Sequence, residues 1–250
     1  MLSRRSVSIG LLSMPFVAKA AQAHADDISD AEQPFFQLSY PAVEALDNPQ
    51  PFGYSEPTEE QKEHVREILA GTPSGPKPID IMQSFVDRFF KTDPDAISQW
   101  PEPAAWNPLV VEFFRATTTH ATNDMIAWCA ASANWCIERA GLNGSRSAGS
   151  QSFLSKKFAR TKSPQRGDLA VFTCYKKGTQ ESLGLGHVTF FKEKISDNLI
   201  RCVGGNQSAD GRSSIISEKA FITSDRIVHR HVGKKYVPCT MRLNSFIRIG

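Results

Sequence analysis

Two side chains in this sequence are of the types and in the surroundings that chemistry requires. Cys129 opens an apolar pattern with helical spacing over residues 129–140, and His187 opens an apolar strand-like run over residues 188–195. A thiol nucleophile and its base are commonly supplied from two distant parts of one fold. The pair therefore predicts cysteine-dependent attack on an amide, with Cys129 as the nucleophile and His187 as the base.

Thiol catalysis requires a thiolate, and a helix N-terminus or a neighbouring imidazolium lowers the pKa of a cysteine. Cys129 meets the first condition if its helix begins near Trp128, whereas a start at Asn123 would place it in the second turn, where the dipole is weaker. The alternative is that Cys129 is a buried structural residue like Cys136. For His187 the alternative is a histidine at a strand edge whose hydrogen bonds are satisfied locally.

Hairpin geometry supplies candidates for a third polar group. If residues 196–198 join two antiparallel strands, paired residue numbers sum to about 394. His187 then faces Gln207, and a bulge at Gly204-Gly205 would bring in Asn206 instead. An amide oxygen there would accept the Nδ1–H bond and turn Nε2 toward the thiol. The alternative for residues 204–208 is a turn, since their types favour turns.

The periodicity predicts helices followed by strands. Thr58 is a plausible N-cap and Gly71 a terminator for the first helix. Helices are expected at 58–70, 79–90, 104–116 and 129–140, and strands at 168–173, 188–195, 199–203, 213–216 and 226–232. This order predicts an α+β fold with helices packed on an antiparallel sheet.

Residues 1–25 have the pattern of an export signal. Arg4-Arg5 precedes an apolar run over 7–17, which is too short to span a bilayer, and small-residue cleavage patterns follow. The arginine pair also resembles a twin-arginine signal. We therefore expect a protein exported to the periplasm or secreted, without a transmembrane segment, with an extended and partly helical appendage at 26–78 and one domain at 79–250.

Charge gives no support to nucleic-acid binding. The chain has 29 basic and 26 acidic residues, and removing the signal removes three basic ones, so the remainder is balanced. Residues 26–150 carry 8 basic and 19 acidic side chains, whereas residues 151–250 carry 18 and 7. The basic part could meet an anionic polymer, or it could be neutralised by the acidic part.

The five cysteines are an odd number, which leaves at least one thiol unpaired within an exported chain. If Cys129 is that thiol, the other four could form two bridges or be buried small hydrophobes. A metal site at His229, His231 and Cys239 is the weaker possibility, because a third ligand at a fixed spacing is missing.

Five ordered motifs resemble a CHAP-type (cysteine, histidine-dependent amidohydrolase/peptidase) or NlpC-like domain, both variants of the papain-like fold. They are Asn107-Pro108, Trp128-Cys129-Ala130-Ala131 with Asn134-Trp135-Cys136, residues 164–172, Gly186-His187-Val188 and residues 204–208. Ser132-Ala133 stands where the family has a bulkier apolar pair.

The resemblance implies a nucleophile at a helix N-terminus packed on the sheet, with Cys129, His187 and Asn206 as the site residues. It also implies cleavage of amide bonds in cell-wall peptides, with peptidoglycan or a peptide as substrate and without a metal or cofactor. The competing hypothesis is an inactive papain-like module that binds cell wall or peptide.

Overall fold

Four helices precede the sheet in the computed structural model, which describes residues 55–100, 105–208, 214–232 and 235–250. The predicted export signal and most of the extended segment lie outside these residues. The helices are α3 (Glu59–Ala70), α4 (Pro78–Phe89), α5 (Pro108–Phe113) and α6 (Cys129–Arg139), with short 3₁₀ turns η2 (Pro94–Ile97), η3 (Phe114–Ala116) and η4 (Ser150–Leu154).

The helix ends follow from local sequence. Thr58 and Gln61 form a reciprocal capping box at the start of α3, and Gly71 ends that helix as expected. α5 starts later than predicted, at Pro108, because the side chain of Asn107 caps it and proline suits the first helical position.

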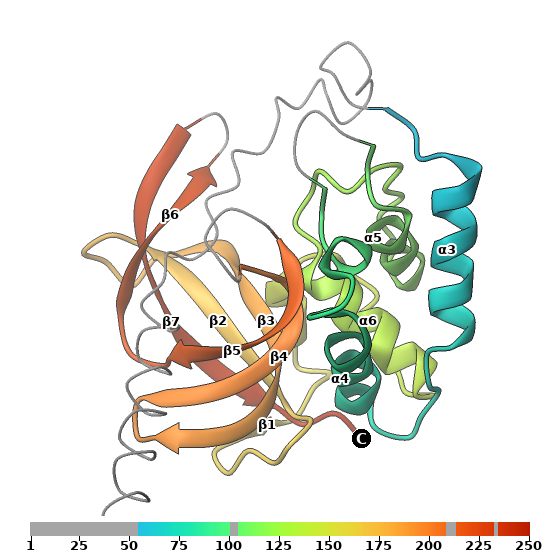
Figure 1. Ribbon diagram of the computed structural model, residues 1–250. Coiled ribbons are helices and arrows are strands. Elements are labelled where there is room, and N and C mark those ends of the chain that lie inside the picture. Colours follow the sequence, from blue (N-terminus) through green and yellow to red (C-terminus); the bar gives the residue numbers. More distant parts are fainter. Residues whose placement is uncertain (1–54, 101–104, 209–213, 233–234) are drawn as a thin grey trace, which may run out of the picture.

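In the described residues seven strands form one antiparallel sheet, which lies beside the helices (Figure 1). They are β1 (Arg160–Thr161), β2 (Leu169–Lys176), β3 (Ser182–Ser196), β4 (Leu199–Gln207), β5 (Ile215–Ile222), β6 (Arg226–Val232) and β7 (Lys235–Ile247). The order is β1-β7-β2-β3-β4-β5, and β6 pairs with β7. The predicted α+β class with an antiparallel sheet is confirmed. The long strand β7 was not predicted, although it joins β1, β2 and β6.

Each face of the sheet has its own hydrophobic cluster. Val171, Val188 and Val203 join the helices in the first cluster, whereas their neighbours Phe172 and Cys202 belong to the second, on the other face. α6 packs across β3 and β4. A residue on β3 therefore faces either α6 or the second cluster, according to the parity of its number.

Glycine on β4 allows α6 to approach the sheet closely. A Cβ on Gly205 would lie 2.3 Å from Cζ3 of Trp128 and 2.5 Å from Oγ of Ser132. The glycine pair that could have been a turn thus lies within a strand, and the small Ser132 leaves the space that a bulkier residue would fill.

α3 packs on the same helical layer as α6. Val65 and Ile68 belong to the first cluster, and the guanidinium of Arg139 at the end of α6 donates to the carbonyls of Leu69 and Thr72. In the described part of the chain, none of the helices combines the length and the apolar character needed to cross a membrane.

Candidate functional site

Cys129 is the first residue of α6, with Trp128 as its N-cap, so the later of the two predicted starts is the observed one. The backbone N–H groups of Ala130 and Val188 donate hydrogen bonds to the Cys129 sulfur, and the side chain of Asn206 donates a third. The first amides of a helix have no acceptor within it, which leaves Ala130 free to make this bond. Three N–H donors from three elements thus converge on one sulfur atom.

Asn206 is held in the orientation that this bond requires. Its φ of 58° lies in the left-handed region that asparagine tolerates better than most residues. Its Oδ1 accepts a 2.7 Å bond from the hydroxyl of Ser214. Because the amide oxygen is turned toward Ser214, the amide nitrogen is the atom that faces Cys129.

His187 lies on β3, where it pairs with Phe172 of β2. Its Nε2 is 3.4 Å from Oε1 of Gln207, which also accepts a 2.9 Å bond from Thr189. The Gln207 Nε2 donates to the carbonyl of Ser217 at 2.6 Å. A carbonyl only accepts, so the amide of Gln207 has one possible orientation and its oxygen faces the ring. The imidazole must therefore carry its proton on Nε2, which leaves Nδ1 unprotonated in the neutral ring.

The ring nitrogens thus have the opposite roles from those predicted. The hairpin of β3 and β4 is present, and pairs near its open end sum to 393, as in Phe190 with Val203. In the pairing with β3 the register shifts between Phe191 and Glu193 and again between Lys194 and Ser196, whereas the irregularity at the glycines, between Gly204 and Gln207, lies in the pairing of β4 with β5. In the structure Gln207 supplies the amide oxygen at the imidazole, while Asn206 reaches the sulfur.

The thiol and the imidazole approach the same peptide unit from different sides. Cys129 bonds to the amide of Val188, the residue after His187. The imidazole leaves β3 on the opposite face from Val188 and stacks on Phe221 of the second cluster, with ring centroids 5.6 Å apart. The structure therefore brings Cys129 against the backbone beside His187, and brings the ring against Gln207 and Phe221.

Both groups are closed off from solvent, since Cys129 is 3% exposed and His187 is 2% exposed. Burial raises the pKa of the Cys129 thiol above its ordinary value, outweighing its three donors and the positive charge of Arg230. Burial also lowers the pKa of His187 to about 3, against the opposing influence of Gln207. The depressed thiol pKa expected from the sequence is wrong for this form of the site, in which the thiol and the imidazole are both uncharged.

Two motifs that carried the family resemblance have structural roles. The buried Asn107 caps α5 and donates to the carbonyls of Ala96 and Ser98. Asn134 donates to the carbonyl of Ser147 and accepts from the amide of Arg146, which fixes the loop after α6.

Asp124 is a buried acid that the sequence analysis did not single out. It accepts from the backbone amides of Trp100 and Asn107, and burial raises its pKa to about 6. An isolated aspartate in a loop gave no sequence signal for this role.

The suggested metal site is not assembled. Cys239 pairs with Val228 and points into the second cluster, whereas His229 is exposed and stacks on Tyr236. Val228 and His229 are adjacent on β6 and point to opposite faces, so His229 and Cys239 cannot both bind one metal ion. Among the residues that the structure describes, there is no group of three or more metal-binding side chains.

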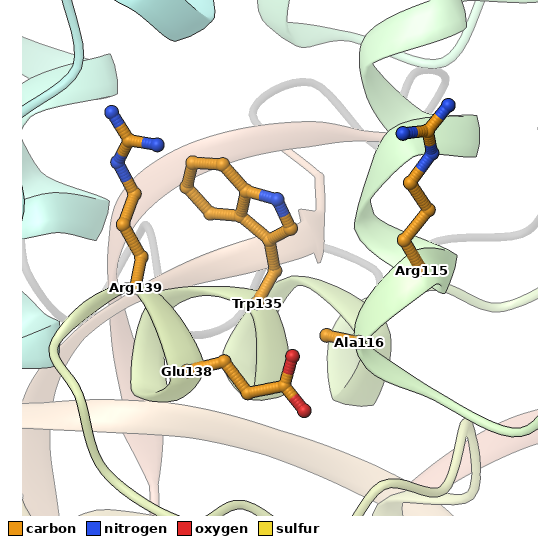
Figure 2. Close-up of a pocket in the computed structure, with 5 residues that line it drawn as sticks. All are labelled: Arg115, Ala116, Trp135, Glu138 and Arg139. Carbon is orange, nitrogen blue, oxygen red and sulfur yellow. The ribbon is translucent and has the colours of Figure 1, made fainter.

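A separate pocket of about 250 Å³ lies along the C-terminal half of α6. Arg115 and Arg139 stand on either side of Trp135, with Glu138 below the indole (Figure 2). Trp135 is six residues beyond Cys129, about 9 Å along the helix axis. Because Arg139 is bonded to the carbonyls that end α3, this side of the pocket is part of the packing between helices.

The fold and the site together define an α+β protein in which a buried cysteine starts a helix that packs on an antiparallel sheet. Residues 121–206 match the family model of the CHAP domain, which confirms the resemblance seen in the motifs. The matched segment runs from the loop before α6 to Asn206 on β4 and so includes both Cys129 and His187. Neither the curated proteins nor the solved structures gave a match to this chain.

Proposed function

We propose that this protein is a hydrolase that cleaves amide bonds in peptidoglycan peptides through the thiol of Cys129. The CHAP domain match supports amidase or peptidase activity toward peptidoglycan-like substrates. The observation that carries the proposal is the set of three N–H donors around the Cys129 sulfur. Such donors stabilise negative charge, and a buried thiol with a purely structural role has no need of them.

In the proposed reaction Nδ1 of His187 removes the thiol proton, and the thiolate attacks the amide carbonyl. Gln207 holds the Nε2–H of the ring and stabilises the imidazolium that forms. The oxyanion is held by the backbone N–H of Cys129 and by the side-chain amide of Asn206. The imidazolium then protonates the leaving amine, and water releases the acyl group from sulfur.

The closed form is the resting state in this proposal. Because the imidazole lies on the Phe221 face of β3, opposite Val188, side-chain rotation alone does not bring Nδ1 to the sulfur, and the backbone of β3 at His187 must rearrange as the site opens. Entry of substrate would supply the opening, and the donors already in place would then favour the thiolate. The uncharged pair protects the thiol from oxidation until that moment, since the thiolate is the reactive form.

The direct test is release of amino groups from purified peptidoglycan by the full chain. Cys129→Ala should abolish release, whereas Cys136→Ala, a change of the same type on the same helix, should retain it in folded protein. Equal turnover by the wild type and by Cys129→Ala would exclude the thiol mechanism.

A non-catalytic wall-binding module is the second candidate, favoured by the closed, uncharged site. Exposed cations gather on the segment before β2, at Lys156, Lys157, Arg160 and Lys162. In this case the full chain would sediment with peptidoglycan, release from it would rise with salt, and no amide would be cleaved. A variant with these four residues changed to glutamine should lose binding to anionic wall polymer.

We also propose export by the twin-arginine route, on the basis of residues 1–25. Replacement of Arg4-Arg5 by two lysines should retain the chain in the cytoplasm, whereas a signal of the ordinary secretory type would tolerate the change. Cell fractionation with detection of the chain distinguishes these outcomes.

A further inference from the structure

Two cysteines outside the proposed site lie together on neighbouring strands. In the pairing of β2 with β7, Cys174 faces Met241 and Cys239 faces Lys176. Met241 and Cys239 are two residues apart on β7, so Cys174 and Cys239 point to the same face as diagonal neighbours. Both are fully buried in the second hydrophobic cluster.

The two thiols are close enough to influence each other. A hydrogen bond from Cys174 is the largest influence on the pKa of Cys239, which it lowers, while the pKa of Cys174 is raised. In this hydrogen bond Cys174 is the donor and Cys239 is the acceptor.

A partly buried cation lies beside this pair. Arg230 lies on the same face of β6 as Val228, the residue that pairs with Cys239. Its guanidinium is 4.0 Å from the Met241 sulfur and bonds to the Cys174 thiol. A positive charge beside two thiols favours the ionised form that thiol–disulfide exchange requires.

The remaining cysteines lack these features. Burial raises the pKa of Cys136 on α6 and that of Cys202 on β4 well above the ordinary value. Cys129 lies on the other face of the sheet in the first cluster. Reactivity toward a disulfide should therefore be confined to one pair.

We propose that Cys174 and Cys239 are a disulfide-forming pair that cross-links β2 to β7 when a small disulfide such as oxidised glutathione is present. The thiolate of Cys239 attacks one glutathione sulfur and releases one glutathione thiol. Cys174 then loses its proton and attacks the sulfur of Cys239, releasing the second. The two cysteines lose two electrons and two protons, and glutathione disulfide is reduced to two thiols.

The position of Cys174 and Cys239 in the sheet lets an oxidant reach them and lets their disulfide affect the proposed site. In the described part of the sheet β6 pairs only with β7, so opening of this edge hairpin admits the oxidant. The bond would fix the hairpin that carries Arg230, whose charge acts on both Cys129 and His187.

The test is oxidation of the reduced, folded full chain with oxidised glutathione, followed by alkylation and peptide mass mapping. We expect one cross-linked species that joins the peptides of Cys174 and Cys239, with the number of alkylated thiols falling from five to three. A cross-link between any other two cysteines, or five free thiols after prolonged incubation, would overturn the proposal.

Variants provide a matched comparison within one cluster. Cys202→Ser, a change at the third cysteine of the second cluster, should leave the cross-link intact. Cys174→Ser should stop the reaction at a glutathione adduct on Cys239. Equal modification of Cys202 and Cys239 in the folded wild type would contradict the assignment, and that measurement needs no variant.

Discussion

At the scale of single residues, the side-chain amides of Asn206 and Gln207 have different roles in the site. Asn206 directs its amide nitrogen at the sulfur, while Gln207 directs its amide oxygen at the imidazole. The roles of these two neighbouring residues can be tested separately, because Asn206 acts on the nucleophile and Gln207 acts on the base. Sequence reasoning found both residues but could not assign them, since the choice depends on the register of β4 and the φ of Asn206.

Asn206→Gly should lower kcat by about a hundredfold, the scale seen when one donor to an oxyanion is removed. Glycine adopts a φ of 58° without strain, so the backbone is preserved. The measurement is steady-state hydrolysis of peptidoglycan fragments by this variant and by Gln207→Leu. Gln207→Leu should instead displace the pH dependence of kcat/KM, because it alters the base. Identical pH profiles of kcat/KM for the two variants would show that Asn206 and Gln207 do not have these separate roles.

At the scale of elements, the contact between α6 and β4 decides where the nucleophile lies. A side chain at Gly205 would collide with Trp128, the residue before Cys129, and with Ser132. The position of the sulfur therefore depends on a glycine that makes no contact with substrate in the proposed mechanism.

Gly205→Ala should reduce the free energy of unfolding by about 1–3 kcal/mol, the usual cost of forcing an extra carbon into a packed core. Denaturant unfolding measures this loss. Gly149→Ala is the matched control, because its Cβ would meet its nearest neighbour, the Ser147 hydroxyl, at an ordinary 3.5 Å. A stability of Gly205→Ala equal to that of the control would show that α6 does not depend on this close approach.

The local signals in the sequence were sufficient for α3, α4 and α6, because the apolar spacing of each lies within a dozen residues and α3 also has a capping box. They were not sufficient for β7. That strand is defined by pairing with β2, more than sixty residues away, and Pro238 within it argues against a strand on local grounds. The same limit applies to the pKa of Cys129, because helix position can be predicted from sequence whereas burial beneath a sheet cannot.

The attachment of α3 to α6 is a further property of elements. Arg139 donates to three carbonyls at the end of α3, those of Leu69, Thr72 and Pro73. Arg139→Met should expose residues 59–77 to protease at least tenfold faster, since the loss of even one hydrogen bond to a charged group costs about 1.5–3 kcal/mol and local opening follows. Timed proteolysis with peptide mapping measures the rate.

Arg115 is the control for this experiment, since it lines the same pocket (Figure 2) but pairs only with Glu112 on its own helical segment in the described contacts. Arg115→Met should leave the cleavage rate unchanged. Equal acceleration by both variants would attribute the effect to the pocket as a whole and not to the anchoring of α3.

At the scale of the whole molecule, two buried groups give opposite responses to acid. His187 has a pKa of about 3 in the folded chain and an ordinary value of 6.5. As pH falls from 6.5 toward 3, the unfolded chain binds this proton first, so stability is lost across that window. Asp124 has a raised pKa of about 6 against 3.8. The folded chain binds that proton first as pH falls from 6 to 3.8, so stability is gained there and the two effects nearly cancel.

Replacing either residue should therefore uncover the pH dependence of stability that the other one contributes. His187→Gln should become more stable relative to the wild type by about 3 kcal/mol between pH 6.5 and pH 4, because each pKa unit corresponds to about 1.4 kcal/mol. Asp124→Asn should become less stable relative to the wild type over pH 6 to 4. Denaturant midpoints across this range, compared as differences from the wild type, isolate each group from the remaining carboxylates. Parallel curves for His187→Gln and the wild type would mean that the imidazole titrates freely, and the closed resting site would then have to be abandoned.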